Sequence, residues 1–533
     1  MLAAMMACGL MQISCLKDDN PVGTPVIEEE GYSISDEEFA AFNGKEIESG
    51  EMTTQAILED MIEDHMDMQT DDDVIYTDYA KSELKLLADA NVGTRAGEDG
   101  EPGIDKTAKL AYTTVRYTTT SVDGSQKEMS ELIVWPISRI LSDPSPKNLI
   151  IGCHCTITSD DQRPTNFNKL KYSTDVGMLA LYASGTLLAG NCLVVIPDYE
   201  GYGVTRDLPH PYLAQELTAQ QVMDAVDYGL KLYQKHVNDK RALPFKDDWR
   251  MFGFGYSQGG AVAVAVQRYI EQHGLDEQLR YRGTLCGDGP YDLIATMRYY
   301  IEDNGDSYGV ETEHRKGIST MPMVIPMIIQ GMIDTHPDMK NHQLTDYLSQ
   351  QFLDTGIMDW LASKDFTINQ IHEKWYEQLQ EGVDAGDRHY TKEQMAELFE
   401  SPKEDRVWAH LYKLFTPSFF EYLNNDANFY AVPTESGNAF KDLHRALVDN
   451  SVTTGWEPKH PIQFVHSKGD MVVPYGNYLS FHDAHPDSEG TIYRIDDSLT
   501  DDHIAVGTSF YLCLTATGTY GEYFQWLDES GST

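Results

Sequence analysis

The feature that most constrains the fold is a series of short apolar runs separated by longer segments of helical character. The runs are 148–153 (NLIIGC), 191–197 (NCLVVIP), 249–255 (WRMFGFG), 280–286, 461–466 (PIQFVH) and 491–495. The segments between them include 175–190, 214–234 and 260–273. Strands that are apolar on both faces must be covered on both faces, as parallel strands joined by helices are. We therefore predict an α/β fold with a mostly parallel sheet between two layers of helices.

The alternation stops between residues 291 and 459. This stretch is rich in Met, Tyr, Gln and acidic residues, and it has helical periods such as Ile368–Gly382 and Lys392–Phe399. Its 169 residues are enough for a domain. We expect a helical cap at 291–459, inserted into a sheet domain formed by 107–290 and 460–533.

Upstream of the sheet domain, residues 20–106 are polar and acidic. Within them Gln55–Met68 has the pattern of an amphipathic helix, so we expect this extension to be a helical arm packed on the main body. Two strand-like runs follow, Leu110–Thr119 and Glu131–Pro136, and the Asp123-Gly124 pair between them predicts a hairpin turn.

The first residues, MLAAMMACGLMQISC, form a short apolar run that ends in a small residue and Cys15. This pattern is typical of a secretory segment rather than of a folded element. Ser14-Cys15 resembles the end of a lipobox, although Gln12 replaces the usual leucine, and the following LKDD resembles the surface-export signal of Bacteroidetes lipoproteins. We expect 1–19 to be a signal segment, Cys15 to be lipidated, and the protein to be an outer-membrane lipoprotein at the cell surface or in the periplasm. A plain signal peptide and a buried apolar N-terminus are the alternatives.

Composition excludes several classes of partner. The 533 residues carry a formal net charge of −45, whereas binding to nucleic acid requires clustered Lys and Arg. The same charge argues against docking on anionic lipid through a basic surface. No run after the N-terminus reaches the roughly 18 apolar residues that span a bilayer. Membrane attachment is therefore expected only through the N-terminal anchor, and the charge suits an exported protein.

Seven cysteines lie at positions 8, 15, 153, 155, 192, 286 and 513. Without the first two, five widely spaced cysteines remain, which is an odd number and not a disulfide framework. The sequence Cys153-His154-Cys155 is no metal site, because adjacent side chains on a strand cannot converge on one ion. We expect no metal and no cofactor.

The sharpest motif is GYSQGG at Gly255–Gly260, which follows an apolar strand and precedes a helix of small residues. This context is typical of a nucleophile elbow, in which the serine has a strained backbone and an exposed Oγ at a helix N-terminus. Glycines two residues before and after the serine avoid clashes across the tight turn. Ser257 is the candidate nucleophile.

A serine hydroxyl needs a base, and the base needs a carboxylate to orient it. In the order serine, acid, histidine, Asp470 follows the run that ends at 466 and precedes Met471–Pro474. His503 follows the last predicted strand and precedes an apolar helix. We predict Asp470 as the acid and His503 as the base, with Asp496 and Asp497 as fallback acids.

These residues resemble the α/β-hydrolase family. Three further segments resemble its secretory lipase-like branch: Pro197–Gly203 (PDYEGYG), His210–Leu213 (HPYL) and Gly289–Asp292 (GPYD). The resemblance implies an α/β-hydrolase fold with a cap that helps to form the acyl pocket. It also implies a serine esterase or lipase that hydrolyses small-molecule acyl esters through an acyl-enzyme. A serine peptidase of prolyl-oligopeptidase type and a non-catalytic lipoprotein that binds lipid or glycan are alternatives, and the oligomeric state is open.

The oxyanion hole of such a site consists of two backbone N–H groups. One belongs to the residue after the nucleophile, Gln258. The other belongs to the loop after the strand that ends at Cys153, where many hydrolases have His-Gly-X and this chain has His154-Cys155-Thr156. We expect the Thr156 amide to be the second donor, with that of Cys155 as its rival, because Cys155 replaces the glycine.

Overall fold

The computed structural model describes residues 26–28, 31–33, 45–67, 108–137, 145–172, 174–183, 191–403, 406–425, 432–433, 437–486, 492–494 and 500–513. The predicted signal segment 1–19 with Cys15, the fallback acids Asp496 and Asp497, and most of the acidic extension lie outside these residues.

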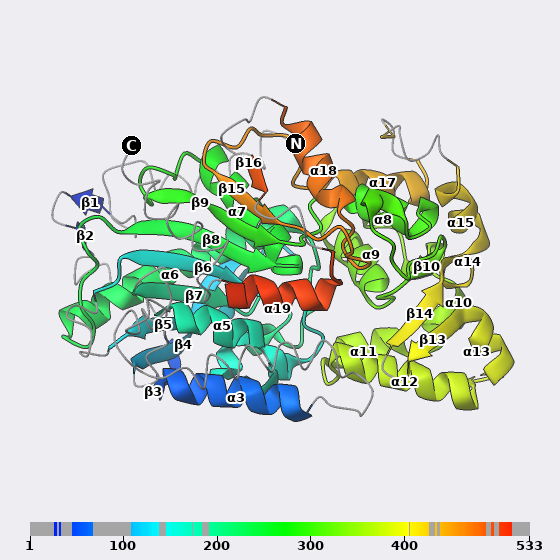
Figure 1. Cartoon of the computed structure of the whole chain (residues 1–533), viewed down its shortest axis with the longest axis horizontal. Helices are drawn as coiled ribbons and strands as arrows, with labels where there is room; N and C mark the ends of the chain where they lie inside the picture. The colour runs from blue at the N-terminus through cyan, green and yellow to red at the C-terminus, as the bar shows by residue number, and fades with distance from the viewer. Residues whose placement is uncertain are drawn as a thin grey trace.

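Nine strands of the described residues form one sheet (Figure 1). Their order across the sheet is β16 (Ile492–Arg494), β15 (Ile462–Val465), β9 (Tyr281–Gly287), β8 (Arg250–Tyr256), β6 (Asn148–Cys153), β7 (Cys192–Pro197), β5 (Gln126–Pro136), β4 (Lys109–Thr120) and β3 (Lys45–Thr53). The six strands from β16 to β7 are parallel, and β5, β4 and β3 join antiparallel at one edge. The mostly parallel sheet is confirmed, and the six apolar runs coincide with strands to within one residue at either end.

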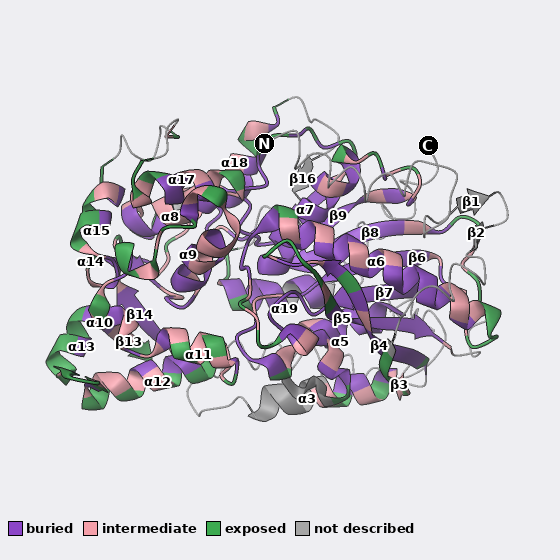
Figure 2. Ribbon diagram, turned by 180° about the vertical axis from the view of Figure 1, so that it is seen from behind, coloured by how far each residue is buried: buried purple, intermediate pink, exposed green. Residues whose placement is uncertain are grey.

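Helices cover both faces of this sheet. One face packs against α6 (Gln215–Asn238), α7 (Gln258–Gln272) and α18 (Gly476–Ala484), the other against α3 (Thr54–Asp67), α5 (Thr174–Ala183) and α19 (His503–Cys513). Leu149 and Ile151 of β6 belong to the first core cluster, and Ile150 between them belongs to the second. Because successive side chains point to opposite faces, the central strands are apolar throughout, and Figure 2 shows them buried. None of the described helices is long and apolar enough to cross a membrane.

The N-terminal extension differs in part from the helical arm that we expected. The predicted amphipathic helix is present as α3, but Lys45–Thr53 before it forms β3, which pairs antiparallel with β4. Residues 46–49 of β3 are exposed, and two of the four are glutamates. An edge strand gains its stability from backbone hydrogen bonds on one side, so its sequence lacks the apolar signal of a buried strand.

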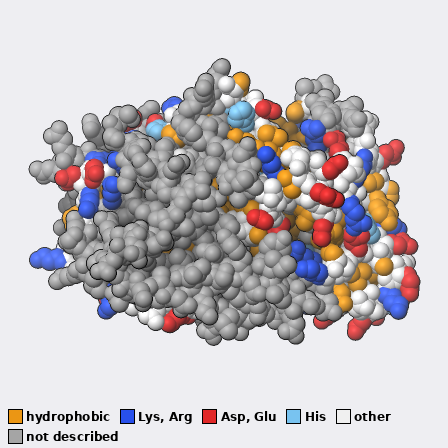
Figure 3. Space-filling model, in the orientation of Figure 1, with side chains coloured by type: hydrophobic (Ala, Val, Ile, Leu, Met, Phe, Trp, Pro, Cys, Tyr) orange, Lys and Arg blue, Asp and Glu red, His pale blue; other side chains and the backbone are white. Residues whose placement is uncertain are grey.

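The segment between β9 and β15 is predominantly helical and lies beside the sheet (Figure 1). Its helices are α8 (Leu293–Glu302), α9 (Val324–Thr335), α10 (Gln350–Leu353), α11 (Ile357–Ser363), α12 (Ile368–Glu381), α13 (Lys392–Leu398), α14 (Leu411–Leu414), α15 (Pro417–Leu423) and α17 (Ala439–Asp449). It also has short strands that we did not predict: β10 (Ile318–Ser319), β13 (Phe399–Lys403) and β14 (Arg406–His410) in one sheet, and the hairpin of β11 (Val383–Ala385) and β12 (Arg388–Tyr390). We call this segment the cap; it has its own core cluster. Acidic and basic side chains are intermingled on its visible face (Figure 3).

The cap is attached to loops of the sheet domain through both backbone and side-chain contacts. The Asp160 amide donates to the Lys364 carbonyl (2.8 Å), and Ser159 forms an isolated antiparallel bridge with Asp365. In return, the Lys364 ammonium donates to the main-chain oxygens of Arg206 (2.6 Å) and Leu208. Since these loops follow β6 and β7, the cap lies over the carboxyl ends of the parallel strands.

Trp375 of α12 is the largest fully buried side chain in the cap. Its ring centroid lies 5.1 Å from that of Phe399 and 6.1 Å from that of Phe352. We expect Trp375→Ala to lower the free energy of unfolding by about 3–5 kcal/mol, because it leaves a large cavity among these rings. Urea unfolding followed by circular dichroism measures the loss. The matched control is Tyr412→Ala, which removes a half-exposed aromatic ring of the same cap and should cost less than about 1 kcal/mol.

Candidate active site

Ser257 lies at the sharp turn between β8 and α7. Its backbone has φ 57° and ψ −125°, a conformation that non-glycine residues rarely adopt. The two flanking glycines are required by contact: a Cβ on Gly255 would lie 2.2 Å from the Gly259 carbonyl oxygen, and one on Gly259 would lie 2.0 Å from the Cys153 carbonyl oxygen. The motif therefore forms the predicted elbow, which holds the serine at the N-terminus of α7.

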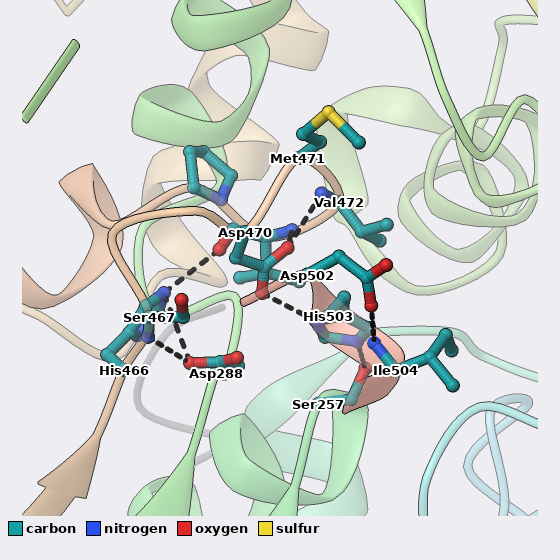
Figure 4. A network of polar contacts seen from close by, with 12 residues as sticks. Ser257, Asp288, His466, Ser467, Asp470, Met471, Val472, Asp502, His503 and Ile504 are labelled. Carbon is teal, nitrogen blue, oxygen red and sulfur yellow. Dashed lines mark hydrogen bonds and ion pairs between the residues drawn. The ribbon is translucent and has the colours of Figure 1, made fainter. Parts of the chain in front are cut away.

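The structure brings the three predicted side chains together (Figure 4). His503 Nε2 lies 2.9 Å from Ser257 Oγ, and His503 Nδ1 lies 2.5 Å from Asp470 Oδ2. His503 begins α19, and Asp502 caps that helix by accepting from the amides of Ile504 (3.1 Å) and Ala505 (3.0 Å). These two hydrogen bonds from Asp502 fix the start of α19 and therefore the position of the His503 imidazole.

Asp470 is held by the loop that follows β15. Its Oδ1 accepts from the amides of Val472 (2.7 Å) and Val473 (2.8 Å), which leaves Oδ2 to face His503. The cap in turn holds this loop, because Tyr300 of α8 donates to the Val472 carbonyl (2.7 Å) and Thr320 donates to that of Met471 (2.9 Å). Only 2% of the Asp470 surface is exposed.

The charged groups around His503 stabilise its protonated, positively charged form. Burial alone would lower the pKa of His503, because it disfavours the charged imidazolium. The charge and the hydrogen bond of Asp470 outweigh burial, with smaller contributions from Asp288 and Asp502, so the pKa of His503 is raised. His503 is thus poised to accept a proton from Ser257 and to hold it as imidazolium.

The loop after β6 distinguishes between the two candidates for the second oxyanion donor. The Cys155 amide already donates to Asp175 Oδ2 (2.8 Å), whereas the Thr156 amide has no acceptor within the described part of the chain. The Thr156 hydroxyl lies 2.7 Å from that of Tyr212, which fixes the loop. Gln258 is the first residue of α7, so its amide has no acceptor within the helix. The geometry therefore favours the Thr156 amide over that of Cys155 as the second oxyanion donor, beside the amide of Gln258.

A layer of polar residues beneath these groups escaped the sequence analysis. Asp288, at the end of β9, accepts from the Ser467 amide at Oδ1 (2.8 Å) and contacts the Tyr256 hydroxyl at Oδ2 (2.6 Å). The Tyr256 hydroxyl also lies 2.6 Å from the His503 carbonyl oxygen. The one available signal was the position of Asp288 directly after a parallel strand, a place where functional side chains gather.

Within the described residues, one group has the spacing of metal ligands: Asp288, His466 and Asp470, whose ligand atoms lie within 4.8 Å of one another. These atoms already bind protein groups. Asp470 binds His503 and two amides, and His466 Nε2 donates to the Val473 carbonyl (2.9 Å). The contacts of this group are therefore explained by hydrogen bonds within the protein.

A cavity of about 270 Å³ separates the loop after β7 from the cap. Its lining includes Tyr202, Leu208, His210, Met327, Met358 and Lys364. His210 connects it to the elbow: Nδ1 lies 2.7 Å from the Glu200 carbonyl and Nε2 lies 3.0 Å from the Gln258 side-chain nitrogen. Burial lowers the pKa of His210 to about 3, so this imidazole is neutral; Nδ1 donates to the carbonyl and Nε2 accepts from Gln258.

Comparison with solved structures identifies the fold. The ligand-bound form of the rice cell wall degrading esterase LipA from Xanthomonas oryzae superposes with a TM-score of 0.58 at 16% sequence identity, over 91% of this chain and 99% of that one. A Legionella pneumophila protein, itself only provisionally assigned as a hydrolase, gives 0.56 at 16% identity, over 91% and 97%. No protein-family model and no curated protein sequence matches. The chain has an α/β-hydrolase fold.

Gly259→Ala tests the close approach at the elbow. The added Cβ would meet the Cys153 carbonyl, which is backbone and cannot move aside, so we expect loss of the Ser257 geometry and a lower melting temperature. The readouts are thermal unfolding and labelling of Ser257 by a fluorophosphonate. The control is Gly437→Ala, at a position where a Cβ meets nothing within 4 Å and no left-handed backbone is needed. Labelling of Gly259→Ala at the wild-type rate would show that the geometry of Ser257 does not depend on a glycine at this position.

Proposed function

We propose that this protein is a serine carboxylic ester hydrolase of the esterase or lipase type. The observation that carries the proposal is the chain of short contacts from Ser257 Oγ to His503 (2.9 Å) and from His503 to Asp470 (2.5 Å), on a serine with the strained elbow backbone. The fold shared with an esterase supports it.

In the proposed reaction Ser257 Oγ attacks the ester carbonyl carbon while His503 Nε2 accepts the hydroxyl proton. The amides of Gln258 and Thr156 donate to the oxyanion of the tetrahedral intermediate. As the intermediate collapses, the C–O bond to the alcohol breaks and His503 returns the proton to the leaving oxygen. Water then attacks the acyl-enzyme with His503 again as base, which releases the acid and restores Ser257. Asp470 orients His503 and stabilises its charged form.

The cavity beside His210 supports a substrate with a short apolar group. Its volume of about 270 Å³ lies just below the range of about 300–1,000 Å³ that is usual for small-molecule sites. Met327, Met358 and Leu361 supply an apolar wall that can adapt to an acyl or alkyl chain. We infer that this cavity holds one end of the ester, next to the proposed oxyanion donor Gln258.

Ser257→Ala should abolish turnover of short p-nitrophenyl esters, since no other hydroxyl would be positioned by His503. Asp470→Asn should lower kcat by about 10³–10⁴, because it removes the charge that stabilises the imidazolium.

Aminoacyl arylamides assayed in parallel test the peptidase alternative. Unchanged ester turnover by Ser257→Ala would refute the proposal, and failure of a fluorophosphonate to label the folded wild type would favour a non-catalytic binding protein.

The cavity gives a second test. Ala362 lines it from α11 and its side chain is exposed, so a larger residue there fills space without disturbing the core. We expect Ala362→Trp to raise KM for butyrate or longer esters by about tenfold, with a smaller effect on acetate esters. Steady-state kinetics over a series of chain lengths measure this. An equal effect on every ester would show that the substrate lies elsewhere.

We also propose that the protein is exported and carries a lipid on Cys15, as Ser14-Cys15 and the following LKDD suggest. Expression in a host that processes bacterial lipoproteins should give a product that partitions into detergent and has the mass of an acylated cysteine. Cys15→Ala should abolish both properties without changing ester turnover by the folded domain. Detergent partitioning by Cys15→Ala would contradict the assignment.

A further inference from the structure

The Tyr256 hydroxyl has one hydrogen but two short contacts to oxygen atoms. Asp288 Oδ2 and the His503 carbonyl oxygen each lie 2.6 Å from it. A carbonyl oxygen cannot donate, so the hydroxyl must donate to His503 if that contact is a hydrogen bond. The second contact then needs a hydrogen from Asp288, because two bare oxygens at this distance repel each other.

We propose that Asp288 is a positioning residue that works as a neutral carboxylic acid. Its Oδ2–H donates to the Tyr256 oxygen, and the Tyr256 O–H donates to the carbonyl of His503. This inference rests on the proposed function, because the parts that Asp288 positions are the proposed base and acid. With this single added proton, both short contacts are ordinary hydrogen bonds.

The carboxyl group connects the segments that carry the three proposed catalytic side chains. Through Tyr256 it reaches the backbone of His503, and its Oδ1 accepts from the Ser467 amide, in the loop that carries Asp470. The preceding residue, Gly287, accepts from the Ser257 amide (2.9 Å). Residues 287 and 288 thus fix three chain segments that are distant in sequence, and Figure 4 shows the contact of Asp288 with the Ser467 segment.

The surroundings of Asp288 favour the neutral form. No part of Asp288 is exposed, and burial raises its pKa to about 7. The charged or titratable groups around it are Asp470 and His466 in or beside the β15 loop, His503 of α19, Tyr256 of β8 and Tyr291 after β9. Of these, Asp470 raises the pKa further, whereas His466 and His503 oppose the rise, as does a hydrogen bond from Tyr256 when Asp288 is ionised and accepts it.

A competing arrangement places the charge differently. Asp288 would be ionised and paired with a protonated His466, whose Nε2 lies 3.9 Å from Asp288 Oδ1. That distance is too long for a hydrogen bond, and the same nitrogen already lies 2.9 Å from the Val473 carbonyl. The competing arrangement also leaves the contact between Tyr256 and His503, or that between Tyr256 and Asp288, without a hydrogen.

Two variants of Asp288 distinguish the arrangement with a neutral Asp288 from the one with an ionised Asp288. In Asp288→Asn the amide reproduces the neutral acid, since Oδ1 accepts from Ser467 and Nδ2–H donates to Tyr256. We expect its kcat/KM at about pH 6 to stay within about twofold of the wild type, whereas Asp288→Leu, which has neither group, should lose at least about tenfold. A tenfold loss in Asp288→Asn as well would overturn the proposal, because it would mean that the negative charge is needed.

The pH dependence provides a second readout. As the pH rises through about 7, Asp288 loses its proton, the contact to Tyr256 breaks, and the new charge raises the pKa of His503 further. Wild-type kcat should therefore pass to a lower plateau, and Asp288→Asn, which has no proton to lose, should show no such step. A step of equal size in both proteins would refute the role of Asp288.

Infrared spectroscopy detects the proton directly and needs no activity. The spectrum of wild type minus Asp288→Asn should contain the carbonyl stretch of one protonated carboxyl group at about pH 5.5 and lose it at about pH 9. Other buried acids with raised pKa, such as Glu131 and Asp198, are common to both proteins and cancel. If Asp288→Asn does not fold, Tyr256→Phe replaces it, because loss of the phenol oxygen shifts the band. Absence of the band at the lower pH overturns the inference, whereas an inactive wild type that shows the band refutes only the ester hydrolase.

Discussion

The backbone contact between the elbow and the end of β6 is the constraint on which the rest of the site depends. Gly259 lies so close to the Cys153 carbonyl that no side chain fits between them. This contact places the loop after Cys153, which carries the proposed oxyanion donor Thr156, beside the N-terminus of α7. The strained backbone of Ser257 is tolerated because β8, α7 and β6 together leave it no alternative.

The cap is part of the site's support as well as its cover. Tyr300 and Thr320 bind the carbonyls of the Asp470 loop, so the orientation of the proposed acid depends on residues of the inserted segment. The cavity beside His210 is formed jointly by the cap and by the loop after β7. The cavity proposed to hold the acyl group and the geometry of the proposed triad therefore both depend on the cap.

Much of this could be predicted from the sequence, for reasons that particular residues make clear. The central strands were recognisable because both faces of each are buried, and Ser257, Asp470 and His503 because each follows a strand and has a distinctive local sequence. The edge strand β3 was missed because its stability comes from backbone pairing and its side chains are largely exposed. Asp288 was missed because its importance lies in contacts with Tyr256 and Ser467, which only the folded chain brings together.

The attachment of the cap through Lys364 determines which substitutions the junction tolerates. On the sheet-domain side the main partners of this residue are the carbonyls of Arg206 and Leu208 and the amide of Asp160. Because every amino acid supplies a carbonyl, the side chain at 208 can be exchanged without loosening the junction, whereas the Arg206 guanidinium itself binds Asp365 and the Ser363 carbonyl (2.9 Å). Leu208 also lines the cavity, so a substitution there can reshape the proposed acyl pocket while the cap stays attached to the sheet domain.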